Sequence, residues 1–156
     1  MARKYGKIAA GLRETKLEAI VVGNVASILN GAPVLTRDVD LLVRSTPLNH
    51  KKLRRFAEVL GGTGPLPITG LTSTERIYGL RVPIDVLYDR LAGKLTFASL
   101  RSRSRAAPVR GETLTVACLA DVIKSKTAAG RPKDKAVLPI LRDVLDARVA
   151  AGLEKR

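Results

Sequence analysis

Two acidic residues at the start of an apolar run restrict how this chain can fold. In the stretch TRDVDLLVR, residues 36–44, the apolar positions between 39 and 43 predict a buried β-strand. Side chains two residues apart in a strand point to the same face, so Asp38 and Asp40 present their carboxylates together. Because isolated ionised carboxylates are costly to bury, the start of this strand has to face a cleft or a cation.

The aspartate pair has two interpretations. A hard divalent cation explains it, because like charges this close repel, and Mg²⁺ binds through one or two carboxylates together with substrate phosphates. Alternatively, the two side chains are solvated at a strand edge or paired with Arg37 and Arg44. An Asp-x-Asp sequence without further context favours this second interpretation.

The neighbouring sequence favours the cation. Gly23 and Asn24 end an apolar run within residues 16–24, and glycine lets a backbone approach a phosphate closely. Asp85 lies in the middle of a second apolar strand, RVPIDVLY. Three acids on strands and a glycine turn suit phosphoryl chemistry with two metal ions.

Length and apolar content predict a single domain. A chain of 156 residues with 46% hydrophobic residues can bury a core of its own, and the alternative is two small lobes that share a cleft. Residues 1–15 are expected to form a basic, partly helical leader, 16–118 a sheet core, and 119–156 the C-terminal helices. The mixed order of strands and helices predicts an α+β fold, in which helices flank a mixed sheet.

Apolar spacing and the glycine and proline positions outline the individual elements. The expected strands lie within 16–24, at 36–43, as several short strands in 66–89, and at 112–118. The expected helices are 25–31, 48–60, 94–100, 119–130 and 132–152.

The charge balance points to a polyanionic partner. There are 28 lysines and arginines against 14 aspartates and glutamates, a net charge of +14, which favours nucleic acid over a merely soluble cationic surface. With three tyrosines, two phenylalanines and no tryptophan, contact with phosphates is favoured over base stacking. Arg101, Arg103 and Arg105 alternate, so an extended segment would align them as a phosphate track.

Several classes of protein are excluded. The single cysteine, Cys118, excludes an internal disulfide, and with only His50 beside it a zinc site is not expected. No apolar stretch is long enough to span a bilayer, and the basic N-terminus is followed by no signal-like apolar core. The expected location is the cytoplasm.

At this point the chain resembles a known family. GNVASILNGAPVLTRDVDLLV, residues 23–43, is similar to the signature of the nucleotidyltransferase superfamily, the fold of the catalytic domain of DNA polymerase beta. In that signature a strand ends in Gly-Gly or Gly-Ser, a helix follows, and the next strand carries Asp-x-Asp. IDVL, residues 84–87, matches the later strand with the third acid. VIKSKTAAGRPKD, residues 122–134, resembles a segment of the minimal, AbiEii-like branch, and the whole resemblance spans residues 16–145.

The resemblance implies a role for each matching residue. Gly23 and Asn24 would bind the triphosphate of an NTP, and Asp38 and Asp40 would hold Mg²⁺ or Mn²⁺. Asp85 would be the third metal ligand or the base near the acceptor hydroxyl.

The C-terminal match adds three more residues. Lys126 would neutralise nucleotide phosphates, and Asp134 would position Lys126 or an arginine. Arg131 either caps the preceding helix or binds phosphate. The chain departs from the family pattern at Asn24, where Gly or Ser is usual, at Asn30, where many relatives have His, and at Val34, where many have Arg.

The activity implied by the resemblance is magnesium-dependent nucleotidyl transfer, in which an acceptor hydroxyl attacks the α-phosphorus of an NTP and pyrophosphate leaves. Positive charge favours RNA as the acceptor, and the AbiEii-like branch implies a toxin of a toxin–antitoxin pair that acts on tRNA and has a cognate antitoxin. Transfer to a small molecule such as an aminoglycoside antibiotic is one alternative. A non-catalytic nucleic-acid-binding domain of the same fold is the other.

Overall fold

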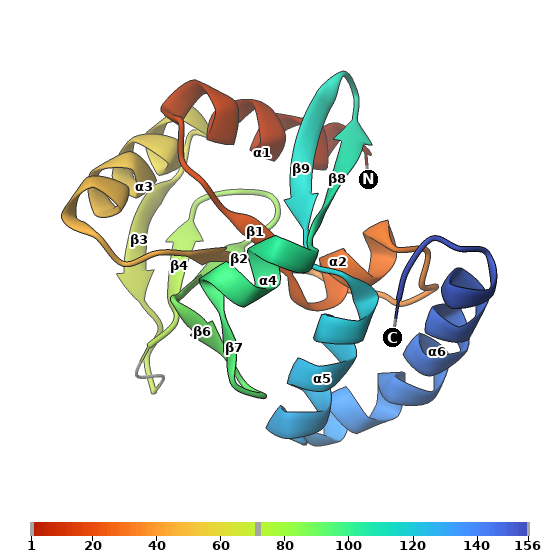
Figure 1. The fold of residues 1–156 in the computed structure, drawn as a ribbon. Coiled ribbons are helices and arrows are strands. Elements are labelled where there is room, and N and C mark those ends of the chain that lie inside the picture. The colour runs from red at the N-terminus through yellow and green to blue at the C-terminus, as the bar shows by residue number, and fades with distance from the viewer. Residues whose placement is uncertain (1, 71–72, 156) are drawn as a thin grey trace.

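A mixed β-sheet forms the centre of the molecule (Figure 1), described by a computed structural model for residues 2–70 and 73–155. Its strands are β1 (Ile20–Val22), β2 (Val39–Val43), β3 (Thr63–Pro67), β4 (Glu75–Tyr78), β5 (Ile84–Tyr88), β8 (Arg105–Val109) and β9 (Glu112–Val116). Their order across this seven-stranded sheet is β3-β4-β5-β2-β1-β9-β8. Two short strands, β6 (Arg90–Leu91) and β7 (Leu95–Thr96), pair separately.

The register of the central strands gathers polar residues into one row. β2 runs parallel to β5 and antiparallel to β1, so Asp40 lies between Asp85 on one side and Val22 on the other. β4 is antiparallel to β5 and sets Arg76 opposite Asp85. Residues that are paired across a sheet point to the same face, so Asp40, Asp85 and Arg76 share one face.

Six helices surround the sheet in the described part of the chain. They are α1 (Ala2–Thr15), α2 (Gly23–Leu29), α3 (Pro47–Val59), α4 (Phe97–Arg103), α5 (Leu119–Ala129) and α6 (Pro132–Ala150). α1 packs against α3 and the β8–β9 hairpin, α2 packs against β1, β2 and α5, and α5 packs against α6 (Figure 1). This arrangement confirms the predicted α+β fold, with helices flanking a mixed sheet and a helical C-terminal part.

One cluster of buried apolar side chains runs from α1 to α6. β1 is buried along its whole length, as its sequence Ile-Val-Val predicts for a central strand. The N-terminal segment, expected as a partly helical leader, is a helix up to Thr15 and buries Tyr5, Ile8 and Ala9 in this cluster. None of the helices in residues 2–70 and 73–155 is long and apolar enough to cross a membrane.

The helix expected at 94–100 lies three residues further along the chain, from Phe97 to Arg103. Thr96 fixes its start as a capping box: the Thr96 hydroxyl accepts from Ser99 N at 3.1 Å, and Ser99 Oγ accepts from Thr96 N at 2.9 Å. The helix therefore includes Arg101 and Arg103, and the extended segment that would align them with Arg105 is not formed.

Candidate active site

A cavity of about 350 Å³ opens where the start of β2 and β5 meets α5 and the beginning of α6. Every residue that the sequence analysis gave a role toward metal or NTP lines it, and so does Asp134, which was predicted to position Lys126 or an arginine. These residues come from distant parts of the chain. They are Gly23, Asn24, Asp38, Asp40, Asp85, Lys126, Arg131 and Asp134. The structure thus brings these residues together, while the individual roles assigned to them stay predictions.

Gly23 makes room for the carboxylate of Asp40. Gly23 is the first residue of α2 and has a positive φ of 66°, in the left-handed region that favours glycine. A Cβ atom at this position would lie 2.4 Å from Asp40 Oδ2, closer than any van der Waals contact allows. Gly23 therefore has a steric role at the site, because any larger residue would displace the Asp40 side chain.

Arg76 is a site residue that the sequence analysis missed. Its guanidinium donates two hydrogen bonds to Asp85, from Nε to Oδ1 at 2.6 Å and from Nη2 to Oδ2 at 3.1 Å. The same Nη2 lies 3.5 Å from Asp38 Oδ2. The hydrogen bond to Asp85 is the main reason why the pKa of Arg76 is raised, and burial opposes it. The chain thus supplies its own counter-ion to two of the three aspartates.

Only the sheet register reveals this arginine. Arg76 belongs to a segment expected as short strands, but nothing in the local pattern pairs it with Asp85, nine positions further on. Within residues 2–70 and 73–155, no three His, Cys, Asp or Glu side chains are arranged as a ready-made metal site. The guanidinium of Arg76 lies between Asp38 and Asp85, and this explains why their carboxylates are held apart.

Asp40 lies close to two other aspartates in a poorly solvated position. Burial raises its pKa to about 6, and the negative charges of Asp85 and Asp38 add to this effect. The positive charges of Lys126 and Lys133 oppose it. A further cation in the cavity would stabilise the ionised form of this carboxylate.

A lysine–aspartate–arginine group forms the opposite wall. Lys126 Nζ lies 3.6 Å from Asp134 Oδ1, and Arg131 Nε donates to Asp134 Oδ2 at 2.7 Å. Burial lowers the pKa of Lys126, although Asp134 acts in the other direction. Asp134 is itself buried, which raises its pKa, but the hydrogen bond and charge of Arg131 outweigh this and the pKa is lowered.

Local sequence explains how this group forms. α5 ends at Gly130 in the left-handed conformation, and Pro132 starts α6 two residues later. Arg131 therefore lies at the start of α6, where Asp134 also accepts from its backbone N–H at 3.3 Å. Asp134 contacts both Lys126 and Arg131, the two kinds of residue that it was predicted to position.

The donor atoms in the cavity suit a hard cation. Carboxylate oxygens of Asp38, Asp40 and Asp85 face the same space, and oxygen is the ligand that Mg²⁺ and Mn²⁺ prefer. Asn24 adds an amide oxygen, Oδ1, which is buried and has no hydrogen-bond partner in the described part of the chain. A buried acceptor without a donor is destabilising, so a ligand that supplies a donor or a cation would relieve it.

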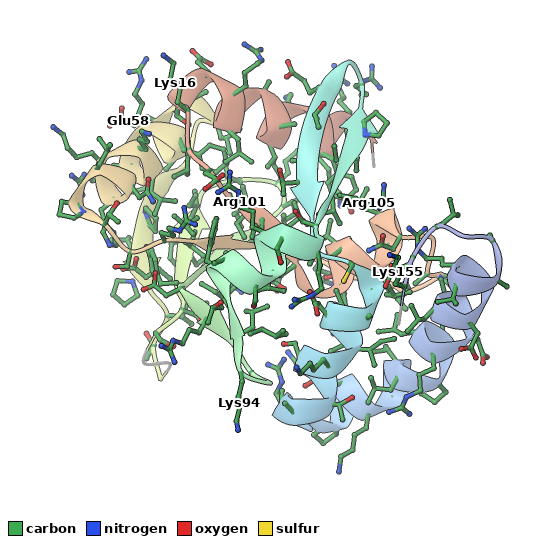
Figure 2. All side chains as sticks on the ribbon, in the orientation of Figure 1. Lys16, Glu58, Lys94, Arg101, Arg105 and Lys155 are labelled. Atoms are coloured by element: carbon green, nitrogen blue, oxygen red, sulfur yellow. The ribbon has the colours of Figure 1, made fainter. Side chains whose placement is uncertain are left out.

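The three arginines predicted as a phosphate track lie outside this cavity and have partners within the chain. In Figure 2, Arg101 and Arg105 lie on either side of the base of the β8–β9 hairpin. Their partners are Glu18, 3.2 Å from Arg101 Nε, Asp121, 2.9 Å from Arg103 Nε, and Asn30, whose Oδ1 accepts from Arg105 Nε at 2.9 Å. These side chains hold elements of the fold together.

Asn30, one of the departures from the family pattern, is the centre of this internal bonding. It is buried, and its Nδ2 donates to Ala26 O at 2.9 Å and to Ala117 O at 3.0 Å. It therefore joins the end of α2 to the end of β9, next to the start of α5. The position has a structural function here.

Known proteins resemble this chain in structure. No protein-family model matches it, and no curated protein matches it in sequence. The structure of ANT(2″)-Ia in complex with adenylyl-2″-tobramycin aligns with a TM-score of 0.66 at 16% identity, covering 97% of this chain and 93% of that one.

Two further solved structures agree. A candidate nucleotidyltransferase from Thermotoga maritima aligns with a TM-score of 0.62 at 17% identity, covering 94% of this chain and 92% of the other. The solution structure of the antibiotic-resistance factor ANT(2″)-Ia aligns at 0.61 and 15% identity, covering 96% and 93%. The chain therefore has the nucleotidyltransferase fold over nearly its whole length. Its place in the AbiEii-like branch stays a prediction.

Proposed function

We propose that the protein is an enzyme that transfers a nucleotide from an NTP to an acceptor hydroxyl and releases pyrophosphate. The observation that carries this proposal is the gathering of Asp38, Asp40 and Asp85 with Lys126 in one cavity of a nucleotidyltransferase fold. Carboxylates that face a buried lysine across a small cavity suit a substrate that combines phosphates with a divalent cation.

The residues of the cavity have different roles in this proposal. Asp38, Asp40 and Asp85 would hold Mg²⁺ or Mn²⁺, which when bound lowers the pKa of the acceptor hydroxyl and steadies the triphosphate. Lys126 and Arg131 neutralise phosphate oxygens as negative charge develops on the leaving pyrophosphate. Gly23 and Asn24 line the same cavity and complete the triphosphate site.

Arg76 and Asp134 act on these groups. In the free protein Arg76 neutralises Asp85 and part of Asp38, so Asp85 exchanges this ion pair when nucleotide and cation enter. Asp134 holds Lys126 and Arg131 on the cavity wall. Arg76 and Asp134 thereby keep the positive and negative side chains of the cavity paired until the substrate binds.

RNA is the acceptor that the charge favours, and the AbiEii-like resemblance favours tRNA. A net charge of +14 attracts a polyanion, and the AbiEii-like resemblance implies a cytoplasmic toxin that a cognate antitoxin restrains. Modification of a tRNA hydroxyl would give such a toxin its effect.

One observation favours a second candidate, an antibiotic as acceptor. ANT(2″)-Ia, whose structure was solved with adenylyl-2″-tobramycin, has the same fold over 93% of its length. Five aspartates line the cavity, namely Asp38, Asp40, Asp85, Asp121 and Asp134, and carboxylates attract a cationic drug.

Transfer of labelled nucleotide tests these proposals. The wild type is incubated with each labelled NTP and Mg²⁺, with total RNA or with tobramycin as acceptor. The variant Asp38→Asn with Asp40→Asn should lose transfer by on the order of a thousandfold or more, because the groups that hold the cation are neutralised. Asp143→Asn, an exposed aspartate of α6 outside the cavity, is the matched control.

Each outcome decides between the candidates. Label on RNA that depends on Asp38 and Asp40 supports the RNA acceptor, and label on tobramycin alone supports the antibiotic. RNA binding without any transfer would leave a non-catalytic binding domain and overturn the enzyme proposal.

A further inference from the structure

A second hollow lies on the other face of the sheet. This groove has a volume of about 630 Å³ and is formed by the first half of α1, Leu60 at the end of α3, and residues 79–82 and 84. Ile84 lines the groove, whereas the next residue, Asp85, lines the cavity described above. Consecutive residues of a strand point to opposite faces, so β5 separates the two hollows.

Positive charge dominates the groove. It is lined by Arg3, Lys4, Lys7 and Arg81, and no acidic residue lines it. In the part of the chain that the structure describes, none of these four side chains forms an ion pair with a carboxylate; Lys4 lies over the ring of Tyr5 at 5.1 Å. Within residues 2–70 and 73–155 the four cations thus have no carboxylate as counter-ion.

Another basic residue of α1, further along the helix, does form an ion pair. Arg13, two turns beyond Lys7 on α1, pairs with Glu112 at 2.9 Å. Arg3 and Lys7 are four residues apart and therefore project from the same side of the helix. Arg3, Lys4 and Lys7 line the groove from the N-terminal half of α1, and Arg81 lines it from the loop before β5.

The floor of the groove narrows the ligand class. Its apolar residues are aliphatic, namely Ile8, Leu60, Leu80, Val82 and Ile84, and no aromatic residue lines it. Without aromatic rings a base-stacking platform is absent from this lining, so the cations would act on phosphates. None of the large apolar side chains exposed on the described surface lines the groove, whereas docking to a membrane surface buries such side chains in lipid.

We infer that this groove binds the phosphate backbone of the nucleic-acid acceptor. The inference rests on the proposed RNA acceptor, and it adds a binding site outside the catalytic cavity. An RNA strand held by Arg3, Lys4, Lys7 and Arg81 lies one strand of the sheet away from Asp85.

Binding of RNA without NTP tests the groove. Fluorescence anisotropy of a labelled single-stranded RNA is measured over a range of salt concentrations for the wild type and for the double variant Lys7→Glu with Arg81→Glu. Affinity should fall by on the order of tenfold or more, and the salt dependence of binding should become shallower, because fewer phosphates are neutralised. Circular dichroism checks the fold; if the double variant unfolds, Lys7→Gln with Arg81→Gln takes its place.

A matched control separates the groove from net charge. Lys135→Glu with Arg142→Glu makes the same change in charge at exposed positions of α6, far from α1 (Figure 1). At physiological salt, charges beyond about 8 Å are largely screened, so this variant should bind nearly as the wild type does. Equal losses in both double variants, or no loss in the groove variant, would overturn the inference.

Two further measurements distinguish this inference from the proposed activity. Asp38→Asn with Asp40→Asn should still bind RNA, so groove-dependent binding supports the inference even where nucleotidyl transfer fails. Transfer to RNA with unchanged affinity in the groove variant overturns the groove alone. Wild-type protein that binds vesicles of anionic phospholipid but not RNA overturns it in favour of a membrane.

Discussion

The two hollows on opposite faces of β5 differ in their balance of acidic and basic residues. In the cavity five aspartates face four basic residues, and most of them pair with one another; in the groove four basic residues face no acid. The overall charge of +14 is therefore not spread evenly, because the cavity is close to balance while the groove carries an uncompensated excess. A balanced cavity suits a ligand that brings both a cation and phosphates, and an unbalanced groove suits a polyanion alone.

Among the single substitutions, the largest effect is expected at the cavity, from Gly23→Ala. The new Cβ would lie 2.4 Å from Asp40 Oδ2 and push the carboxylate aside, and misplacing a reacting group by about 1 Å can cost on the order of a hundredfold in rate. Nucleotidyl transfer measures this, and RNA binding should not change, because Gly23 does not line the groove.

Gly31→Ala is the control for backbone strain. Gly31 also has a positive φ, of 98°, but a Cβ there would meet nothing within 4 Å. Equal losses of transfer in the two variants would mean that strain, and not the clash with Asp40, causes the effect.

The next prediction concerns the free energy of unfolding as a function of pH, which should depend on the cavity through Asp40. Burial and two neighbouring carboxylates raise the pKa of Asp40 from 3.8 to about 6, so the folded state holds this proton more tightly than the unfolded state does. Between about pH 4 and pH 6, loss of the proton should therefore destabilise the fold, by about 2–3 kcal/mol in total. Urea unfolding of wild type and Asp40→Asn should show this decline in the wild type only. An identical pH profile for both proteins would contradict the assignment.

The smallest effect contrasts one arginine from each hollow. Arg76→Gln removes the partner of Asp85 and part of the partner of Asp38, and should lower the free energy of unfolding by about 1–2 kcal/mol without added metal. Added Mn²⁺ should restore more stability to this variant than to the wild type. Thermal unfolding with and without Mn²⁺ makes the measurement.

Arg81→Gln is the counterpart in the groove. Arg81 is exposed and has no ion pair in the described part of the chain, so its loss should change stability by no more than about 0.5 kcal/mol. A loss as large as that of Arg76→Gln would mean that the groove, too, is balanced by contacts within the protein.

Local patterns were sufficient to predict the three strand aspartates and the glycine turn that line the cavity. The strand expected at 36–43 begins at Val39, so Asp40 lies in β2 and Asp38 directly precedes it. Gly130 followed by Pro132 turns the chain so that Arg131 and Asp134 meet Lys126. These relations depend on residues close in sequence. The resemblance to nucleotidyltransferases supplied the roles of Lys126 and Asp134.

Arg76 could not be found in this way. Its partner, Asp85, is defined by the antiparallel register of β4 and β5, and register depends on how whole strands pair. The alternation of Arg101, Arg103 and Arg105 was misleading for a related reason, because the capping box at Thr96 makes the first part of that segment helical.

By itself, the sequence determined the kind of fold, the polar residues that open the central strands and the large excess of positive charge, because each follows from residue type and short-range spacing. Tertiary structure decided where that charge is free to act. Packing pairs Arg103 with Asp121 and Arg76 with Asp85. It gathers Arg3, Lys4, Lys7 and Arg81 in a groove where none of them forms an ion pair with a carboxylate of the described residues. The physical reason is that an ion pair needs two groups within a few ångströms, and residues far apart in the chain reach that distance only when the whole fold has formed.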